Sequence, residues 1–305
     1  MPSLPQPQSS ESFKRDDAAS YDDVADRFEQ YTEQVTVPIA RRVVERAGLK
    51  PSDRVLDVGC GTGVLCRLSA GQAGSVVGLD LSEGMLRKAA ALAAAAPHGE
   101  RIEFRRGDAE RLEFEDTSFD AVISLYALRH LPNPRQALAE MARVGRRGSP
   151  VVVGVGSAPP LLSGSFLAGG LWAAMDAARS LVGRGALRAT GVLDRLVEKH
   201  LGARAHGHGT ADAIGDLVQA MRSAGYVDVH SEWLGQMSTI TSVDEFWGLQ
   251  VTLSTGARKT LAETPAAEVQ ALRDEFDAVC KTHLQRGGTL VYRSGALIVR
   301  GRRPA

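Results

Sequence analysis

The chain has 305 residues, of which 36 are lysine or arginine and 36 are aspartate or glutamate, and 44% of its residues are hydrophobic. Proteins that bind nucleic acid or anionic lipid through phosphate groups usually carry a basic excess, so the balanced charge argues against both partners. Three cysteines without a CxxC spacing argue against a disulfide framework and a structural zinc, which is typical of a reducing compartment.

The N-terminal part is predicted to hold a tail and two helices. Residues 1–19 begin with the polar run MPSLPQPQSSES, so we expect a disordered tail and no signal peptide. Residues 20–50 are predicted to form a helical cap with a pair of helices between Tyr21 and Ala47. Tyr21 and Tyr31 either close over a site or serve the packing of these helices, and the sequence leaves both alternatives open.

Residues 51–157 alternate short apolar runs with helical stretches and are predicted to form the core domain. Strands are expected at residues 54–58, 75–80, 102–106, 119–125 and 151–155. Helices are expected between them at residues 64–69, 83–96 and 134–144. Near-continuous apolar strands separated by helices predict a parallel sheet that is covered on both faces.

The rest of the chain is predicted to add helices and two more strands to the same sheet. Residues 158–212 are expected to be a helical insertion without a strand. Residues 213–305 are expected to complete the core with strands at 227–234 and 296–300. A second helical insertion at residues 242–286 is expected to lie together with the first above one edge of the sheet.

The glycine-rich run after the first expected strand is the sharpest feature of the sequence. It reads VLDVGCGTG from Val55 to Gly63, an apolar strand that ends in a tight turn and opens a helix. Glycines suit such a turn because they adopt positive φ and let a ligand approach the main chain. A dinucleotide fingerprint requires its third glycine one position later, where this chain has Val64.

Two acidic residues at the ends of the following strands narrow the choice of ligand. Asp80 ends the run SVVGLD, 17 residues after Gly63, where a carboxylate can accept hydrogen bonds from both ribose hydroxyls. A nicotinamide enzyme would carry this acid too. Asp108 follows the third strand, in a position to accept from an adenine amino group. Such charge-assisted hydrogen bonds contribute roughly 1.5 to 3 kcal/mol each, so the two acids predict an adenosine site.

Together these segments resemble the class I S-adenosylmethionine-dependent methyltransferases, in particular the branch of quinone-biosynthesis C-methyltransferases and small-molecule methyltransferases. The matching runs are VLDVGCGTG, VVGLDLSEGML, GDAERL and FDAVISLYALRHLPNP, in this order and spacing within residues 20–155. The resemblance implies an α/β, Rossmann-like seven-stranded sheet with the last strand antiparallel, flanked by helices, with helical insertions that cap the active site. It implies S-adenosyl-L-methionine as the cofactor.

The resemblance also implies roles for single residues, although Asp57 taken alone could be a helix-capping acid and Asp108 a turn residue. The cofactor-binding set that it implies is Asp57, Gly59, Cys60, Gly61, Gly63, Asp80, Leu81, Met85, Gly107, Asp108, Ala109 and Leu125. In this set Asp57 and the glycine loop line the methionine end, and Asp80 takes the ribose. One departure from the family is the run RRGSP at residues 146–150, which lies ahead of the fifth strand.

Candidate catalytic residues follow the fourth strand, in the run YALRHL. His130 is the candidate base, because a phenol, hydroxyl or activated carbon has to lose a proton during methylation. Tyr126, together with Arg129, could orient an oxygen of the acceptor. A packing role for His130 is the alternative, since methyl transfer needs mainly a well-held nucleophile and exclusion of water.

No metal site is predicted. The three histidines of the run HLGARAHGHG, His200, His206 and His208, are expected in a solvated loop without a carboxylate nearby.

The predicted activity is methyl transfer to C or O of a small lipophilic or aromatic metabolite, such as a quinone, phenol, polyketide or terpenoid. Two alternatives stay open: use of the bound cofactor for another reaction such as a cyclisation, and modification of a protein or nucleic acid. We expect a cytoplasmic monomer or homodimer that acts on a small molecule. The uncharged stretch 148–175 is interrupted by prolines and glycines, so no integral membrane association is expected.

Overall fold

A single mixed sheet organises the chain in the computed structural model, which describes residues 10–22, 24–157, 176, 185–202 and 216–305. The strand order is β3-β2-β1-β4-β5-β8-β6, and β7 pairs with β8. The strands are β1 (Arg54–Val58), β2 (Ser75–Asp80), β3 (Ile102–Arg106), β4 (Ala121–Leu125), β5 (Pro150–Gly156), β6 (Ala186–Arg188), β7 (Val227–Ile240) and β8 (Thr289–Arg302).

Strands β1 to β5 run parallel, whereas β8 is antiparallel to both β5 and β7. The predicted α/β sheet with an antiparallel last strand is therefore confirmed. The described sheet has one strand more than the seven predicted. The additional strand, β6, lies in the insertion that was expected to be wholly helical, and it pairs with β8. Three residues are too short a run to carry a strand pattern in the sequence.

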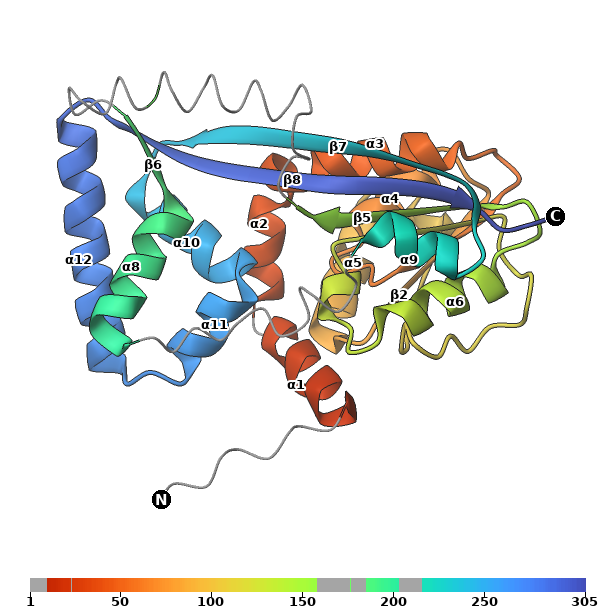
Figure 1. Cartoon of the computed structure of the whole chain (residues 1–305), viewed down its shortest axis with the longest axis horizontal. Helices are drawn as coiled ribbons and strands as arrows, with labels where there is room; N and C mark the ends of the chain where they lie inside the picture. Colours follow the sequence, from red (N-terminus) through yellow and green to blue (C-terminus); the bar gives the residue numbers. More distant parts are fainter. Residues whose placement is uncertain (1–9, 23, 158–175, 177–184, 203–215) are drawn as a thin grey trace.

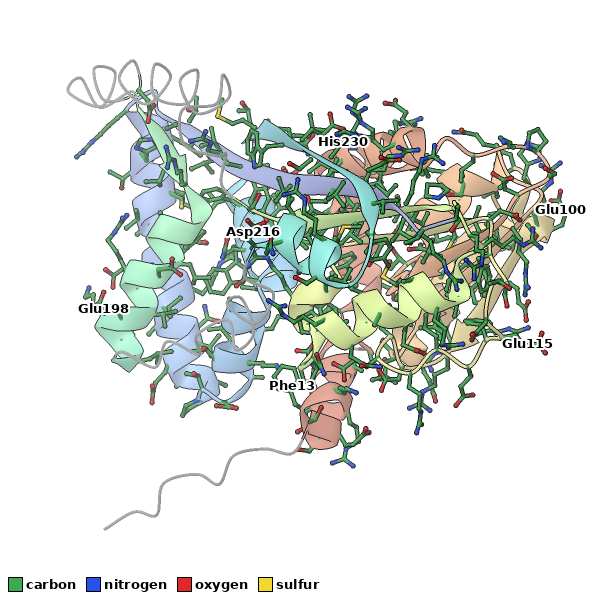
Figure 2. The ribbon with its side chains drawn as sticks, turned by 45° about the vertical axis from the view of Figure 1, so that its right-hand side comes forward. Phe13, Glu100, Glu115, Glu198, Asp216 and His230 are labelled. Carbon is green, nitrogen blue, oxygen red and sulfur yellow. The ribbon has the colours of Figure 1, made fainter. Side chains whose placement is uncertain are left out.

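Helices surround the sheet on both faces and build a separate cap. They are α1 (Ser10–Asp22), α2 (Ala25–Val35), α3 (Val37–Ala47), α4 (Val64–Ala70), α5 (Glu83–Ala94), α6 (Pro134–Val144), α8 (Ala189–Leu201), α9 (Leu217–Ser223), α10 (Val243–Leu253), α11 (Thr255–Ala262) and α12 (Ala266–Gln285), with short 3₁₀ helices η1 (Gly99–Arg101) and η2 (Leu128–His130). Polar side chains fix several helix starts. Ser82, Asn133 and Asp216, of which Figure 2 labels Asp216, accept hydrogen bonds from backbone amides of the first turns of α5, α6 and α9.

Two apolar layers bury the faces of the sheet. On one face α3 and α4 pack Val43 and Leu65 against Val55 and Ile123. On the other face α6 and α9 pack residues such as Met141 and Leu217 against the strands, with Phe119, Val153 and Val299 in the same layer. The β-branched strand residues meet the helices on both faces, as a covered parallel sheet requires.

The helical cap has its own core beyond the edge of the sheet. Phe246 and Leu249 of α10, Phe276 of α12 and Leu193 of α8 are fully buried together. The described helix of the first predicted insertion, α8, thus packs against α10 and α12 of the second. Strands β7 and β8 are each 14 residues long and extend from the core to the cap (Figure 1), well beyond the short strands predicted. The apolar pattern typical of a buried strand is weaker where β7 and β8 extend beyond the parallel sheet, because one face of the strands there no longer packs against core helices.

Helix α1 corrects the prediction of a disordered tail over residues 1–19, as far as the described residues reach. Ser10–Asp22 is helical, although it has only a weakly amphipathic pattern. Its buried side chains are charged: Lys14 and Asp17 form ion pairs with groups of the core and the cap. Tertiary ion pairs, which a local pattern cannot reveal, therefore hold this helix.

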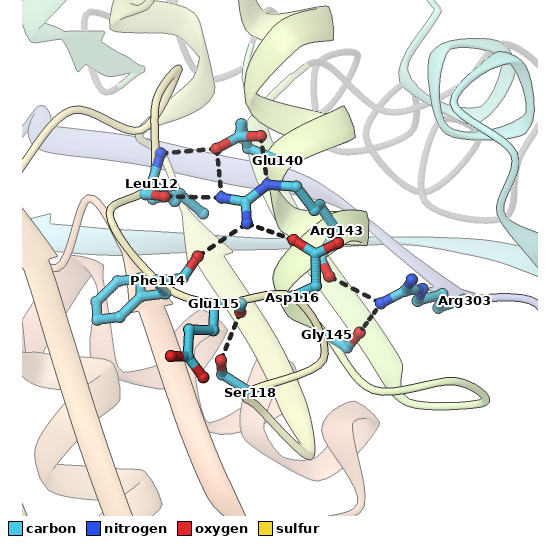
Figure 3. A network of polar contacts seen from close by, with 9 residues as sticks. All are labelled: Leu112, Phe114, Glu115, Asp116, Ser118, Glu140, Arg143, Gly145 and Arg303. Atoms are coloured by element: carbon cyan, nitrogen blue, oxygen red, sulfur yellow. Dashed lines mark hydrogen bonds and ion pairs between the residues drawn. The ribbon is translucent and has the colours of Figure 1, made fainter.

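A polar network stabilises the loop that follows β3 (Figure 3). The guanidinium of Arg143 donates to the carbonyl oxygens of Leu112 at 2.7 Å and Phe114 at 2.8 Å, and it pairs with Asp116 and Glu140. Arg146 pairs with Asp120, and Arg147 donates to the backbone of Ala305. The basic side chains of Arg143, Arg146 and Arg147, which lie close together in the sequence, thus all make contacts within the protein.

No helix among the described residues is long and apolar enough to cross a membrane. Most of the uncharged stretch at 148–175 lies outside the described residues, and its beginning forms β5.

Candidate functional site

A cleft opens where the carboxyl ends of the parallel strands meet at one edge of the sheet. It measures about 1090 Å³ with its open mouth included. Every residue of the predicted cofactor set except Gly63 lines it, together with both candidate catalytic residues, Tyr126 and His130. Ligands of open α/β sheets bind in such a crevice, so the topology places the predicted residues where a ligand would lie.

The glycine loop after β1 requires glycine at defined points. Gly59 and Gly61 have φ values of 73° and 52°. A Cβ on Gly59 would lie 2.2 Å from the Cβ of Ala127, whereas one on Gly61 would meet no atom within 4 Å. Gly59 therefore allows close packing within the protein, and Gly61 keeps the loop open toward the cleft. Gly63 begins α4 with φ 79° and packs near Phe104, so its function is local geometry and not lining.

Asp57 is a buried acid with an unsatisfied oxygen. The Sγ of Cys66 lies 3.2 Å from its Oδ2, but its Oδ1 has no hydrogen-bond partner. Burial, the largest effect, raises the pKa of Asp57 to about 7, with a further contribution from the charge of Asp80 and an opposing one from Cys66. A buried acceptor left without a donor is costly unless a ligand completes it.

Cys60 lies in the same loop as a buried thiol. The hydrogen bond with Cys66 acts to lower its pKa, but burial and the carboxylates of Asp80 and Asp57 outweigh it and raise the pKa to about 11. The thiol therefore stays protonated at neutral pH, where it is a poor nucleophile. Burial likewise raises the pKa of Cys66.

Asp80 ties the glycine loop to the end of β2. Its Oδ2 accepts from the amide of Gly61 at 2.8 Å, and its Oδ1 accepts from the amide of Ser82 at 3.0 Å. Burial raises the pKa of Asp80 even though these amides act to lower it. Each carboxylate oxygen has a second lone pair, so the group can still accept from ligand hydroxyls.

Asp108 contacts a residue that the sequence prediction overlooked. Its Oδ2 accepts from the ammonium group of Lys14 at 2.8 Å, and its Oδ1 accepts from the amide of Glu110 at 2.8 Å. Lys14 also pairs with Glu110 at 2.7 Å. Helix α1 therefore covers the edge of the cleft at which the adenine amino group was expected.

Apolar residues complete the cleft lining. Leu81, Met85, Ala109 and Leu125 lie along it, and a Cβ on Gly107 would lie 2.7 Å from the side chain of Leu79, which would have to shift. These surfaces suit a flat aromatic ring next to the acids.

Tyr126 has an unusual backbone for an aromatic residue. Its φ is 64°, a conformation that costs energy for any side chain other than glycine and that clusters at functional sites. Burial raises the pKa of Tyr126 well above its usual range. The phenol therefore remains protonated and can donate a hydrogen bond, but it cannot act as a base at neutral pH.

His130 faces two residues of α1. Its Nδ1 lies 3.3 Å from Oδ2 of Asp17, and its Nε2 lies 3.4 Å from the hydroxyl of Tyr21. The Tyr21 and His130 rings meet edge-on at 5.6 Å between centroids. Tyr21 thus lies at the cleft, whereas Tyr31 is buried in the core of the cap. Arg129 lies in η2 next to His130 but is not part of the cleft lining.

Of the residues that α1 contributes to the cleft, sequence reasoning offered only Tyr21 and missed the other three. Lys14, Asp17, Ala18 and Tyr21 all line it, and their spacing of three, four and seven residues is that of one helix face. That spacing was the available signal. Further lining residues are Phe28, Thr36, Thr62, Val64, Leu65, Leu79, Ser82, Ala127 and Leu131.

The expectation for the three histidines is corrected in part. His200 lies in α8, not in a loop, and its Nε2 is 2.8 Å from the carboxylate of Glu275. His206 and His208 lie outside the described residues. Within the described part of the chain, no cluster of three or more histidine, cysteine or acidic side chains is arranged to hold a metal.

The fold and the cleft together define a class of protein. A parallel sheet with an antiparallel strand beside β5, a glycine loop after β1 and acids after β2 and β3 is the architecture of the class I S-adenosylmethionine-dependent methyltransferases. Residues 56–153 match the model of a family described as methyltransferase domain, so the central part of the chain is similar to the proteins of this class.

Comparison with individual proteins agrees with this class. A demethylmenaquinone methyltransferase of Renibacterium salmoninarum is 40% identical over 150 residues, which are 47% of this chain and 59% of that protein. A 2-phytyl-1,4-naphtoquinone methyltransferase of Synechococcus elongatus is 34% identical over 136 residues, 42% of this chain and 58% of that protein. The chain thus spans less than two thirds of the length of these relatives.

A solved structure extends the likeness of the fold to nearly the whole chain. Phosphoethanolamine N-methyltransferase 2 of Haemonchus contortus, in complex with S-adenosyl-L-methionine, aligns with 99% of this chain and 62% of its own chain. The TM-score is 0.54 at 18% sequence identity, which shows a shared fold.

The residues of the cleft fit S-adenosylmethionine, the cofactor of this class. The partnerless Oδ1 of Asp57 requires a donor, and the cofactor carries an ammonium group. The open space above Gly61 leaves the main chain of the loop accessible.

Proposed function

We propose that the protein transfers a methyl group from S-adenosylmethionine to a carbon or oxygen of a small aromatic hydroxyl compound, with a reduced quinone as the preferred acceptor. The observation that carries this proposal is a single cleft that joins the acids Asp57, Asp80 and Asp108 to an apolar wall containing His130. The names of the two curated relatives, which refer to demethylmenaquinone and a phytylnaphthoquinone, support an acceptor of the quinone type.

Three acids would hold the cofactor in one orientation. Asp57 would accept from its amino group through the partnerless Oδ1. Asp80 would accept from the ribose hydroxyls, and Asp108 from the adenine amino group, each through lone pairs that the contacts with the protein leave available. Such hydrogen bonds are worth roughly 1.5 to 3 kcal/mol each.

Bound S-adenosylmethionine supplies a methyl group on a positively charged sulfur. The chain would accelerate transfer by holding the acceptor at near-attack distance and by excluding water from the cleft. Nε2 of His130 would take the proton of an acceptor hydroxyl, which makes the oxygen, or the ring carbon ortho to it, a stronger nucleophile. For carbon methylation the ring hydrogen leaves as a second proton, and the aromatic ring is restored.

The acceptor would lie between helices α1 and α2 and the loop after β4. Tyr21, Phe28 and Leu131 offer an apolar wall there, and the hydroxyl of Tyr126 is a donor for an acceptor oxygen. Because Arg143 and Arg146 are engaged within the protein, we favour a small molecule over nucleic acid as acceptor. A cytoplasmic monomer or homodimer remains part of the proposal.

The test is a reaction with 2-phytyl-1,4-naphthoquinone that has been reduced with dithionite. We expect S-adenosylhomocysteine and the ring-methylated product by mass spectrometry, and neither with the unreduced quinone, because its ring is electron-poor. The Asp80→Ala variant is the control for cofactor dependence. Absence of S-adenosylhomocysteine with this quinol and with simple phenols would contradict the proposal. A changed acceptor without S-adenosylhomocysteine would indicate a non-methylating reaction such as a cyclisation.

A further inference from the structure

Asp17 is an acid from α1 that contacts the loop after β4 and the cap at the same time. Its side chain is only 8% exposed. Oδ2 lies 3.3 Å from Nδ1 of His130, and Oδ1 accepts from the ammonium group of Lys259 in α11 at 2.9 Å. A surface carboxylate gains little from such contacts, but a buried one with two partners is held in a fixed geometry.

The neighbours of Asp17 keep its carboxylate ionised. Burial acts to raise the pKa of Asp17, but the hydrogen bonds and charges of His130 and Lys259 outweigh it, and the pKa is lowered. Lys259 is itself held next to α1, with its ammonium group 5.2 Å from the ring centroid of Phe13 (labelled in Figure 2). Arg258 of the same helix stacks over the ring of Tyr21 at 4.2 Å.

An ionised carboxylate can only accept hydrogen bonds, and this determines which tautomer a neutral imidazole in contact with it adopts. Neutral His130 must carry its hydrogen on Nδ1 to bond with Asp17. The lone pair of Nε2 then points toward the hydroxyl of Tyr21, which lies with His130 in the wall of the cleft. An acceptor hydroxyl that takes the position of the Tyr21 hydroxyl would meet a basic nitrogen.

We propose that Asp17 is a positioning residue, which holds His130 in the Nδ1-protonated form and directs Nε2 at the acceptor. This inference rests on the proposed function and adds the residue on which the base depends. In the proton-transfer step, the O–H bond of the acceptor breaks, an N–H bond forms at Nε2, and the carboxylate of Asp17 balances the resulting imidazolium. The proton then leaves to water, and no other reactant is required.

The first test reads the imidazole directly and needs no acceptor. In protein with ¹⁵N-labelled histidine, two-bond ¹H–¹⁵N correlations report which ring nitrogen carries the hydrogen, and the His130→Gln variant assigns the signals. We expect the Nδ1-protonated form in the wild type and its loss in Asp17→Asn. The Asp16→Asn variant is the matched control, because Asp16 is the exposed neighbour of Asp17 on the same helix and pairs only weakly with Arg15 at 3.8 Å. The Nε2-protonated form in the wild type would overturn the proposal.

The second test separates positioning from simple stabilisation of α1. We expect Asp17→Asn to lower kcat about 10²-fold with the reduced naphthoquinone, with cofactor affinity changed less than threefold, and Asp17→Glu to restore part of the loss. In the double variant with His130→Gln, the Asp17 substitution should add no further loss, because both act through one group. Additive losses, or a loss confined to cofactor affinity, would contradict the role. If the wild type makes no product, the proposed function fails, while the tautomer measurement still stands by itself.

Discussion

The ammonium group of Lys14 lies 2.8 Å from Oδ2 of Asp108. Burial acts to lower the pKa of Lys14, but the bonds and charges of Asp108 and Glu110 outweigh it and raise the pKa, so the lysine is charged. The acid expected to meet the adenine is therefore also the acid that holds α1 over the cleft. Cofactor binding and docking of α1 are linked through this one carboxylate.

Removing either nucleoside-binding acid should weaken cofactor binding. We expect Asp80→Ala and Asp108→Ala each to raise the Kd for S-adenosylmethionine about 10- to 100-fold, since each removes charge-assisted hydrogen bonds worth roughly 1.5 to 3 kcal/mol. Isothermal titration calorimetry measures the change.

The matched control for these two variants is Glu103→Ala. Glu103 is an exposed acid of β3 that pairs with Arg105 at 2.7 Å and does not line the cleft. It should leave the Kd unchanged. Wild-type affinity in both the Asp80 and the Asp108 variant would rule out the assigned adenosine site.

Cofactor affinity should rise with pH because of Asp57. Its pKa is raised to about 7, so the carboxyl is largely neutral at pH 6 and charged at pH 8, and only the charged form attracts an ammonium group fully. We expect the Kd to fall across this window in the wild type and to change less in Asp57→Asn. The difference between the two proteins is the measured quantity, because the amino group of the ligand titrates in both.

The stability of the cofactor-free protein should fall as pH rises, whereas the cofactor affinity should rise. Between about pH 4 and 7 the folded state keeps a proton on Asp57 that the unfolded state has released, so the free energy of unfolding falls as pH rises. Urea unfolding of the wild type and Asp57→Asn at pH 5 and 7.5 checks this. If the free energy of unfolding changes equally between the two pH values in the wild type and in Asp57→Asn, burial does not raise the pKa of Asp57.

The sequence predicted the parallel core well because four of its five strands are buried and its loops carry glycine and acids at fixed spacing. The run from Val55 to Gly63 predicts a strand, a tight turn and the start of a helix, and the structure has β1, the turn and then α4 from Val64. Prediction was poorer where tertiary contacts determine whether a strand forms and how long it is. The full lengths of β7 and β8 depend on pairing with each other, and β6 depends on the edge of β8.

The difference between local sequence pattern and tertiary contact also explains which cleft residues the sequence did not predict. Asp57 and Asp80 lie at the ends of buried strands and Asp108 follows the edge strand β3, so their position at one edge of the sheet follows from topology. Lys14 and Asp17 belong to a helix that ion pairs hold in place, and a polar helix without an apolar stripe resembles a tail in a sequence. Only the structure reveals the partners that bury their charges.

Two glycines with similar backbone angles should respond differently to alanine. Gly59 (φ 73°) and Gly48 (φ 63°) both adopt the left-handed conformation, so either substitution costs about 1 kcal/mol of backbone strain. Only at Gly59 would the new Cβ also overlap Ala127, at 2.2 Å, while at Gly48 it meets nothing within 4 Å. We expect Gly59→Ala to lower stability by clearly more than Gly48→Ala and to weaken cofactor binding at least tenfold. Equal Tm values and equal affinities for the two variants would contradict a steric requirement at Gly59.

Substitutions of Tyr126 and His130 should have different kinetic effects, because Tyr126 is proposed as a hydrogen-bond donor and His130 as a base. Since burial keeps the phenol of Tyr126 protonated, Tyr126→Phe removes one hydrogen bond and should raise the KM for the reduced naphthoquinone about 3- to 10-fold without changing the pH dependence of kcat. His130→Gln should lower kcat about 10²- to 10⁴-fold and abolish the rise of kcat with pH, because the proton acceptor is lost. Full pH profiles of kcat for the three proteins decide between the roles. If the rising limb disappears in Tyr126→Phe and persists in His130→Gln, then a phenolate of Tyr126 and not the imidazole takes the proton, and the protonated state assigned to Tyr126 is wrong.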